Sequence, residues 1–368
     1  MPAVSTVAPP ESPPIESAKP GAERIHDLEH DSSVLALAAN DEYIYAGTQD
    51  GEIVVWSLGT FQRVARVQAH RRSVLCLFLS KVTATTAAAA ASTDSQLLVS
   101  SAGDAIISIW CPKTLKRLYE IYSLHDVGDI FSVAYSPQHE TVYFGAQNTS
   151  IQWVNLKDPK RKTTHDSAQH PDRRSHRFFD SAPAGGTSTP RRNEERWTHI
   201  PRAETVLEAD HGAILQFAHY GYVYCMLMAK GLTHKVDAEE DVLISGAGDG
   251  TVKLWRLGAQ GDGDDDDGSP SGIQELIALG TDDGESVWSI AIDRSFLYCG
   301  KLGGVIELWD LDTAQRLRVI KSHEKDVMTL QMRWGSLWSA AANGFVSVGS
   351  PYPPWFCSAR PAGSSLSL

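Results

Sequence analysis

One pattern of apolar and polar positions recurs along the chain, and it is clearest between residues 242 and 257. An apolar run at 242–244 is followed by a glycine-rich turn at 246–250 and by a second apolar run that ends at Trp255. Two short strands joined by such a turn form an antiparallel hairpin. The pattern therefore predicts a hairpin that ends in tryptophan.

Related hairpins occur before and after this one, each with a turn residue six positions ahead of its tryptophan. The pairs are Asp50 with Trp56, Asp104 with Trp110, Gln147 with Trp153, Asp249 with Trp255 and Gly303 with Trp309. A polar landmark and another apolar run precede each hairpin. The landmarks are His30, His70, His125, His211, Asp282 or Asp283, and His323, and the runs are 34–39, 74–79, 131–135, 214–217, 287–292 and 327–332.

The spacing between units identifies the repeat. It is 40 residues from His30 to His70 and again from Asp283 to His323. A period of about 40–45 residues with four short strands, an early histidine and a tryptophan on the third strand is the WD40 signature. We predict an all-β fold, a WD40 β-propeller with six recognisable repeats. The last repeat has Gly349 where its tryptophan would stand, so we expect an incomplete ring and an incomplete chain.

The landmark residues have a structural interpretation. A histidine and an aspartate are expected to join a strand serine and the tryptophan indole in a buried hydrogen-bond network, while the tryptophan fills the space between blades. The second unit supplies His70, Ser100, Asp104 and Trp110, and the fourth supplies His211, Ser245, Asp249 and Trp255. Asp50, Trp56, Trp153 and Trp309 hold the corresponding places elsewhere.

Composition along the chain sets the expected domain boundaries. Residues 1–24 hold six prolines and predict a disordered lead-in. The propeller is expected over 25–344, with disordered inserts at 82–96, 157–204 and 259–272, and an irregular tail over 345–368. Repeats along the chain favour one large domain.

Two segments have more than one interpretation. The insert 157–204 has eleven Lys or Arg against seven Asp or Glu, and is either a solvated loop or a docking or phosphorylation segment centred on Thr189, Arg191 and Arg192. In the fourth unit Tyr220, Tyr222, Tyr224, Met226 and Met228 alternate as one strand face. That face packs in the core or forms an exposed aromatic patch for a partner.

Overall composition argues against several classes of function. A net charge of −12 argues against nonspecific nucleic-acid binding, which needs cations to neutralise phosphates. The sequence has no signal pattern and no apolar run of the roughly 18 residues that a membrane span needs. Five scattered cysteines indicate buried, reduced thiols. We expect a cytoplasmic protein, and a nuclear location stays open.

Catalysis is not expected in this chain. A propeller enzyme would need acids or histidines converging on the central channel, but the apolar runs expected to line it are nearly free of titratable groups. Asp293 and His219 are the nearest candidates. We therefore predict no catalytic, cofactor-binding or metal-binding residue.

Several strings outside the repeat signature point to a family. They are YIYAGTQDGEIVVWSLGTF, SAGDAIISIWCPKTLKRLYEIY, DVGDIFSVAYSP, GAQNTSIQWV, RFFDSAPAGGTSTPRR and AHYGYVYCMLMAKG. Over about residues 24–344 the chain resembles the N-terminal propeller of the fungal glutathione-degradation subunit, which fuses WD40 repeats to a zinc metallopeptidase-like domain.

The resemblance implies a seven-bladed ring in the full family member. It also implies a protein partner, a glutamine-amidotransferase-like subunit, with which the γ-glutamyl bond of glutathione is cleaved. The peptidase domain has no counterpart here, so no zinc ligand or catalytic residue carries over. The alternative is a generic WD40 scaffold or substrate adaptor unrelated to glutathione.

Overall fold

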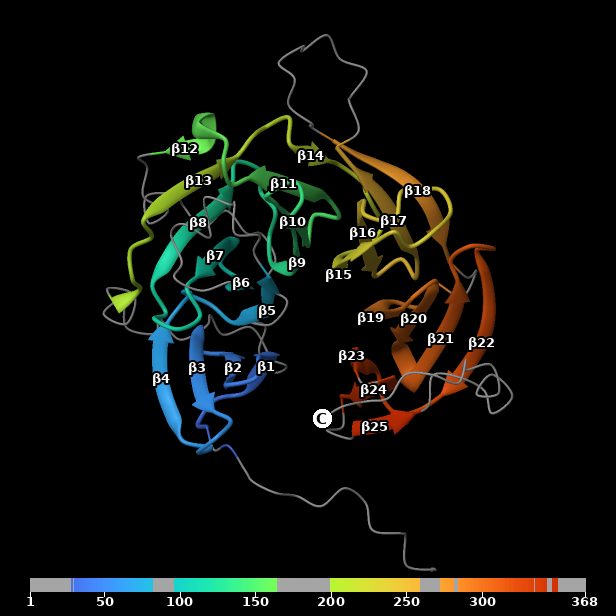
Figure 1. Ribbon diagram of the computed structural model, residues 1–368, viewed down its shortest axis with the longest axis horizontal. Coiled ribbons are helices and arrows are strands. Elements are labelled where there is room, and N and C mark those ends of the chain that lie inside the picture. The colour runs from blue at the N-terminus through green and yellow to red at the C-terminus, as the bar shows by residue number, and fades with distance from the viewer. Residues whose placement is uncertain are drawn as a thin grey trace, which may run out of the picture.

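The computed structural model describes residues 28, 30–81, 96–163, 199–258, 272–280, 284–333, 335–342 and 346–349. In this part of the chain, strands form six sheets arranged one after another around a central axis (Figure 1). Short 3₁₀ helices occur at Pro159–Arg161 (η1) and Leu302–Gly304 (η4). The predicted all-β WD40 propeller fold is confirmed.

Three sheets are four-stranded antiparallel meanders that run in chain order from the axis outward. The first contains β1 (Val34–Ala39), β2 (Tyr43–Thr48), β3 (Glu52–Ser57) and β4 (Arg63–Gln68). The fourth contains β15 (Val223–Lys230), β16 (Asp241–Ala247), β17 (Val252–Leu257) and β18 (Ile273–Leu279). The fifth contains β19 (Val287–Asp293), β20 (Phe296–Lys301), β21 (Val305–Asp310) and β22 (Gln315–Lys321).

The other three sheets vary this plan. The second contains β5 (Val74–Lys81), β6 (Gln96–Ala102), β7 (Ile106–Trp110) and β8 (Arg117–Ser123), extended by β13 (Thr205–Ala209) and β12 (Lys162–Thr163). The third contains β9 (Ile130–Ser136), β10 (Thr141–Ala146), β11 (Ile151–Asn155) and β14 (Ile214–Leu215). The sixth contains β23 (Val327–Arg333), β24 (Ser336–Ala341) and β25 (Val346–Gly349).

The inner strands connect the sheets into an arc. Each lies beside the next in the order β1, β5, β9, β15, β19 and β23. Among the described residues no comparable contact joins β23 back to β1. The six sheets therefore follow the curvature of a propeller ring (Figure 1).

The insert predicted at 157–204 is ordered at its start, which corrects the prediction of disorder throughout. Its first residues form η1 and β12, and β12 pairs antiparallel with β13. In turn β13 runs parallel to β8, with Leu207 opposite Ile121, and Leu207 is fully buried. This apolar contact draws the chain back over the edge of the second sheet, covering backbone groups that would otherwise be unpaired.

Other predicted boundaries also change. The tail from 345 begins as a strand and not as irregular chain, because β25 pairs with β24 and places Val348 opposite Trp338. The β-branched residues at 346 and 348 favour a strand, a signal that the proline-rich residues after them concealed. The lead-in 1–24, most of the inserts at 82–96 and 259–272, and residues 164–198 lie outside the described residues, as do Asp282 and Asp283.

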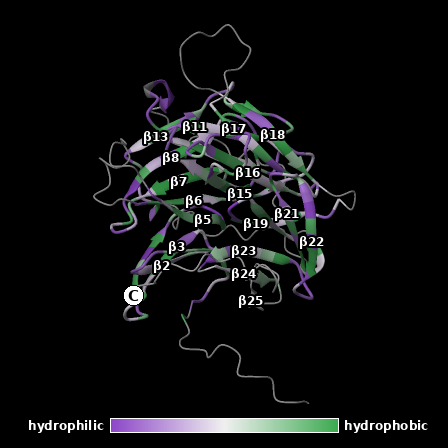
Figure 2. Ribbon diagram, turned by 45° about the vertical axis from the view of Figure 1, so that its right-hand side comes forward, coloured by the Kyte–Doolittle hydropathy of each residue, from purple (hydrophilic) through white to green (hydrophobic). Residues whose placement is uncertain are grey.

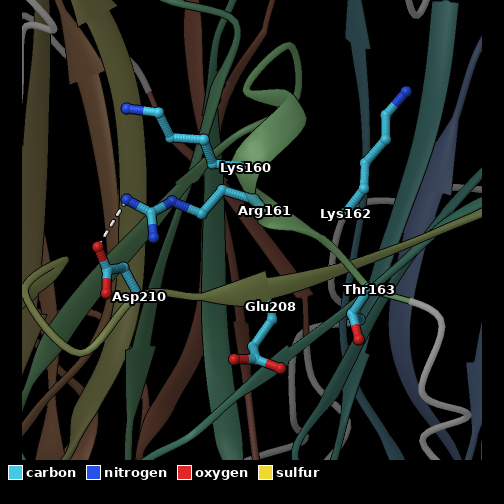
Figure 3. Close-up of a pocket in the computed structure, with 6 residues that line it drawn as sticks. All are labelled: Lys160, Arg161, Lys162, Thr163, Glu208 and Asp210. Carbon is cyan, nitrogen blue, oxygen red and sulfur yellow. Dashed lines mark ion pairs between the residues drawn. The ribbon is translucent and has the colours of Figure 1, made fainter.

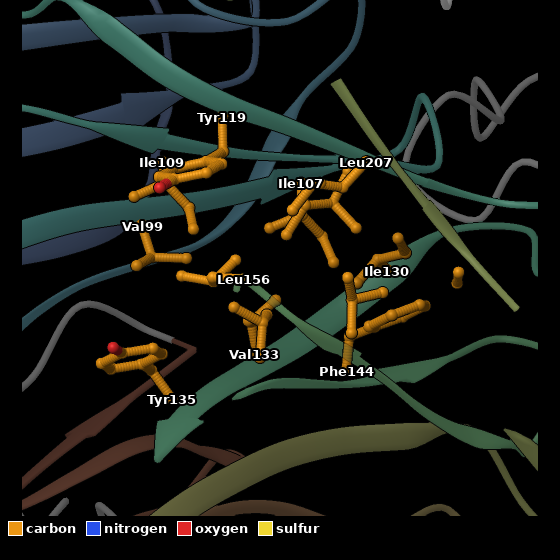
Figure 4. Packing of buried hydrophobic residues seen from close by; sticks show 14 of the residues in the cluster. Val99, Ile107, Ile109, Tyr119, Ile130, Val133, Tyr135, Phe144, Leu156 and Leu207 are labelled. Carbon is orange, nitrogen blue, oxygen red and sulfur yellow. The ribbon is translucent and has the colours of Figure 1, made fainter. Parts of the chain in front are cut away.

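Apolar side chains between neighbouring sheets form the cores. Figure 2 shows hydrophobic positions recurring along the strands. One cluster lies between the second and third sheets and includes Val99, Ile107, Val133 and Phe144 (Figure 4). Leu207 from β13 belongs to the same cluster. The insert that follows the third sheet therefore stabilises the second.

A glycine in the second strand of several sheets allows the next sheet to approach closely. A Cβ atom at Gly47 would lie 2.5 Å from Val74 Cγ1, one at Gly246 would lie 2.8 Å from Val287 Cγ1, and one at Gly300 would lie 2.8 Å from Val327 Cγ1. Each valine begins the next inner strand. Real Cβ contacts do not come this close, so the glycines set the distance between blades.

Candidate interaction face

The structure brings the predicted residues of the second unit together. His70 Nε2 lies 2.8 Å from Ser100 Oγ, and Trp110 Nε1 donates a 2.9 Å hydrogen bond to the same oxygen. His70 Nδ1 lies 3.2 Å from Asp104 Oδ1. His70, Ser100 and Trp110 are buried, so the network ties the loop before β5 to the strands β6 and β7.

In the fourth unit the network uses His219, and the prediction of His211 is wrong. His219 Nε2 lies 2.7 Å from Ser245 Oγ, to which Trp255 Nε1 donates at 2.8 Å. His219 Nδ1 lies 3.4 Å from Asp249 Oδ2. His211 instead packs edge-on against His125 with ring centroids 5.3 Å apart.

The error has a structural cause. The apolar run at 214–217, which was expected to be the inner strand of the fourth unit, supplies β14 and completes the third sheet by pairing with β11. The chain then passes Phe217, whose φ of 56° lies in the left-handed region, before β15 begins at Val223. The histidine that precedes the true inner strand is therefore His219.

The remaining repeats differ at the serine position. His323 Nε2 lies 2.8 Å from Ser339 Oγ in the sixth sheet, a pair that the sequence analysis missed. The equivalent strand positions hold Ala46, Phe144 and Cys299 in the first, third and fifth sheets. Among the described residues, a serine hydroxyl at this position contacts the histidine in the second, fourth and sixth sheets, and it also accepts from a tryptophan in the second and fourth.

The tryptophans of the other sheets are held in other ways. Trp56 is buried and packs edge-on against His30, with centroids 6.1 Å apart. Trp153 is half-buried beside a core cluster, and Trp309 Nε1 donates to Glu307 Oε2 at 3.2 Å. The backbone carbonyl of Asp50 accepts a hydrogen bond from Gln68. Thr189, Arg191 and Arg192 lie outside the described residues.

Asp249 is a charged structural group. Its burial favours the neutral acid, but hydrogen bonds from His219, from the Tyr220 and Thr251 amides and from the Thr251 hydroxyl outweigh this and hold the pKa of the carboxyl well below its usual range. A carboxylate with such a low pKa is a poor proton acceptor near neutral pH. Its role is to fix the loop around Tyr220.

Replacing His219 by alanine should therefore lower the free energy of unfolding by about 1–3 kcal/mol, because Ser245, Thr251 and Asp249 lose a buried partner. The matched His211→Ala change should alter it by no more than about 0.5 kcal/mol, since His211 is exposed. Urea denaturation followed by tryptophan fluorescence measures both. Equal losses in the two variants would contradict this assignment.

A cavity of about 650 Å³ lies among the inner strands. Its lining is mainly apolar and comes from β1, β5, β9, β15 and β23, with Gln331 and Arg333 at β23. Burial raises the pKa of Cys76, in this lining, to about 11, and burial raises the pKa of Cys225 on β15 to about 12. Both thiols are protonated at neutral pH and are weak nucleophiles.

A second, polar hollow of about 210 Å³ lies at the outer edge of the second sheet (Figure 3). It is lined by Lys160, Arg161, Lys162, Thr163, Glu208 and Asp210. Arg161 Nη2 pairs with Asp210 Oδ2 at 2.6 Å, and the Tyr122 hydroxyl donates to Glu208 at 2.6 Å. These contacts stabilise the junction of η1, β12 and β13.

The described residues contain no group of three or more His, Cys, Asp or Glu side chains that could hold a metal ion. Nor does any helix in the described ranges have the length and hydropathy to cross a membrane. Asp293 lies at the end of β19, and His219 belongs to the structural network.

The face at which the inner strands begin, called here the upper face, has a repeated feature. Every inner strand has a register shift at its second position, where one residue is bulged. The bulged residues are all large and apolar or aromatic. They are Leu35, Leu75, Phe131, Tyr224, Trp288 and Met328.

In the third, fourth and fifth sheets these side chains touch one another. Tyr224 stacks on Trp288 with centroids 4.2 Å apart and packs edge-on against Phe131 at 5.3 Å. Tyr222 stacks on Phe131 at 6.0 Å. We name Phe131, Tyr222, Tyr224 and Trp288 the aromatic crescent. It is a continuous aromatic cluster built from three successive blades, in which Phe131 is buried and the other three rings are partly exposed.

Comparison with known proteins agrees with the repeat. Residues 22–57 and 213–256 match the WD40 family, described as WD domain, G-beta repeat. A relative from Saccharomyces cerevisiae, "Probable di- and tripeptidase DUG2", is 30% identical over 359 residues, which cover 88% of this chain and 38% of the relative. The chain thus spans well under half the length of that relative.

Among solved structures, the computationally designed Ika8 protein is similar with a TM-score of 0.49 and 22% sequence identity, covering 87% of this chain and 71% of that one. The repeats found by sequence and the sheets described above identify a WD40 propeller. Propellers of this kind present a rigid surface for protein–protein interaction.

Proposed function

We propose that this chain is the non-catalytic WD40 scaffold of a cytosolic complex that cleaves the γ-glutamyl bond of glutathione, and that it binds a glutamine-amidotransferase-like subunit. The observation that carries the proposal is the 30% identity to the yeast probable di- and tripeptidase over 88% of this chain. A match over 88% of the chain extends well beyond residues 22–57 and 213–256, the two stretches that match the WD40 family.

The chemistry of the described residues supports a scaffold role. The central cavity is mainly apolar, and its cysteine is protonated at neutral pH. His219, which was the histidine candidate for a catalytic site, is fully buried and bonded to Ser245. A buried, fully bonded histidine cannot reach a substrate. Peptide-bond cleavage in the proposed complex would therefore depend on other parts of the assembly.

The propeller fold provides a rigid framework for binding a partner. The inner strands are fixed by buried networks at His70 and His219, and by close packing between sheets at Gly47 and Gly246. Loops held on such a frame lose little conformational entropy when they bind a partner. This property suits a subunit whose task is to position a second protein.

The test is direct binding. The full chain is co-expressed with the amidotransferase-like subunit from the same genome, and the mixture is analysed by size-exclusion chromatography with light scattering. We expect one species with the summed mass, and no glutamate release when the chain alone is incubated with glutathione. An unrelated glutamine amidotransferase serves as the control and should elute separately.

Failure of the two proteins to associate would overturn the proposal. Equal association with the unrelated amidotransferase would do the same, because it would indicate a nonspecific scaffold. Either result would favour the alternative of a generic WD40 adaptor.

A further inference from the structure

Besides the aromatic crescent, the upper face carries two strongly exposed aromatic side chains. Tyr220 is 89% exposed and Phe217 is 75% exposed, and both precede β15, which carries Tyr224. The Tyr220 amide donates to Asp249 Oδ2 at 2.7 Å, so the exposed ring stands on a fixed backbone. Exposed aromatic residues on rigid supports are typical of binding surfaces.

The loops around the crescent are acidic. On the third, fourth and fifth sheets, the upper-face loops within the described ranges 124–129, 147–150, 210–222, 248–251, 284–286 and 302–304 contain no lysine or arginine. They carry Asp126, Asp129, Asp210, Asp249 and Glu285. Asp126 and Glu285 are exposed, and Lys321 from β22 reaches this side only to bond the Gly303 carbonyl.

We propose that the upper face binds a partner segment in which an aromatic or aliphatic side chain is flanked by lysine or arginine. This rests on the proposed function as a protein-interaction scaffold and names the chemistry of one partner segment. The apolar side chain packs against the crescent and against Tyr220 and Phe217. The cationic flanks face the exposed carboxylates of Asp126 and Glu285.

Charge decides the class of partner. An acidic or uncharged apolar segment could cover the same rings, but an acidic one would meet like charges around the whole contact. A basic segment gains Coulomb attraction and can also place a cation over a tyrosine or tryptophan ring. The attraction between exposed groups is screened by salt, so binding should weaken as ionic strength rises.

The probes are three fluorescein-labelled synthetic peptides, GRRSFRRG, GRRSARRG and GEESFEEG, measured by fluorescence anisotropy with the full chain. We expect GRRSFRRG to bind at least ten times more tightly than either of the other two. The variants Tyr220→Ala with Phe217→Ala, and separately Glu285→Lys, should weaken that binding at least tenfold. Neither change removes a buried side chain, so both proteins should fold.

A matched control is Phe61→Ala. Phe61 is a 36% exposed aromatic residue between β3 and β4, in a loop at the opposite end of the sheet. Its removal should leave peptide binding unchanged. Equal binding of GRRSFRRG and GRRSARRG, or equal loss in the Phe61 and Tyr220 variants, would overturn the proposal.

The segment 164–198 of this same chain, with six Lys or Arg against five Asp or Glu, carries similar side chains, including Arg177, Phe178 and Phe179, and is the alternative occupant. Replacing it by a glycine-serine linker should not change the affinity for GRRSFRRG. A tenfold gain in affinity would show that the chain's own segment competes for the face, and would overturn the assignment to a partner.

The same variants separate this proposal from the previous one. If the Tyr220 and Phe217 double variant loses peptide binding but still associates with the amidotransferase-like subunit, the upper face binds a different partner segment and the inference stands. If wild-type chain binds the subunit but not GRRSFRRG, the inference fails while the proposed function stands.

Discussion

Replacing Trp110 by alanine is expected to lower the free energy of unfolding by about 3–5 kcal/mol. The indole is fully buried in the cluster between the first and second sheets, against Tyr45, Ile53 and Leu98. Its removal leaves a cavity and withdraws the donor to Ser100. A shift of the urea midpoint at unchanged slope would report this loss of stability.

Two controls separate packing from hydrogen bonding. Trp110→Phe keeps most of the ring volume but removes the N–H group, and should cost about 1–3 kcal/mol. Trp153→Ala removes a half-buried indole of the third sheet, which lies opposite Tyr143 and packs against the cluster shared with the fourth sheet, and should cost about 1–2 kcal/mol. If Trp153→Ala lowered the free energy of unfolding as much as Trp110→Ala, the burial of the indole would not determine the cost of removing it.

The repeat could be predicted from the sequence because each blade needs the same local signals. The mainly apolar runs at 34–39, 74–79, 287–292 and 327–332 fall on the inner strands β1, β5, β19 and β23. The turns before Trp110 and Trp255 likewise join β6 to β7 and β16 to β17. Each of these strand and turn signals lies within a few consecutive residues, so the periodicity of the sequence is enough to find it.

Sheet membership could not be predicted in the same way. Ile214 and Leu215 are as apolar as an inner strand, yet they pair with β11 of the preceding sheet. The parallel pairing of β13 with β8 also joins segments far apart in the sequence. Such contacts depend on what each strand meets after folding, and local propensity does not contain that information.

An exposed aromatic patch over residues 220–228 was predicted as one of two alternatives, and it includes the Tyr222 and Tyr224 members of the aromatic crescent. Alternation over residues 220–228 suggested a single strand face, either in the core or exposed. In the structure the strand begins at Val223 and bulges before Cys225, so Tyr220 is exposed while Met226 and Met228 pack beside the core. Phe131 and Trp288 join Tyr224 only because three bulges occur at the same height of the ring.

The fifth sheet replaces the serine network with a buried ion pair. Lys301 Nζ lies 3.5 Å from Glu307 Oε1, and the two side chains are 1% and 4% exposed. Glu307 also accepts hydrogen bonds from Trp309 and from Arg316. The glutamate thus does for Trp309 what Ser100 does for Trp110, but it brings a charge into the core that needs compensation.

Glu307→Gln should therefore lower the free energy of unfolding by about 3 kcal/mol, because the buried Lys301 ammonium loses the carboxylate it faces. The matched change is Glu275→Gln on β18, which removes the partner of Lys253 in a pair that is 17% and 44% exposed. That pair is screened by water and should contribute less than about 1 kcal/mol. The double change Lys301→Met and Glu307→Leu removes both charges, and a smaller loss than that of Glu307→Gln alone would assign the cost to the uncompensated Lys301 ammonium. If Glu307→Gln proved no more harmful than Glu275→Gln in the same urea titration, the buried Lys301 would not need the charge of Glu307.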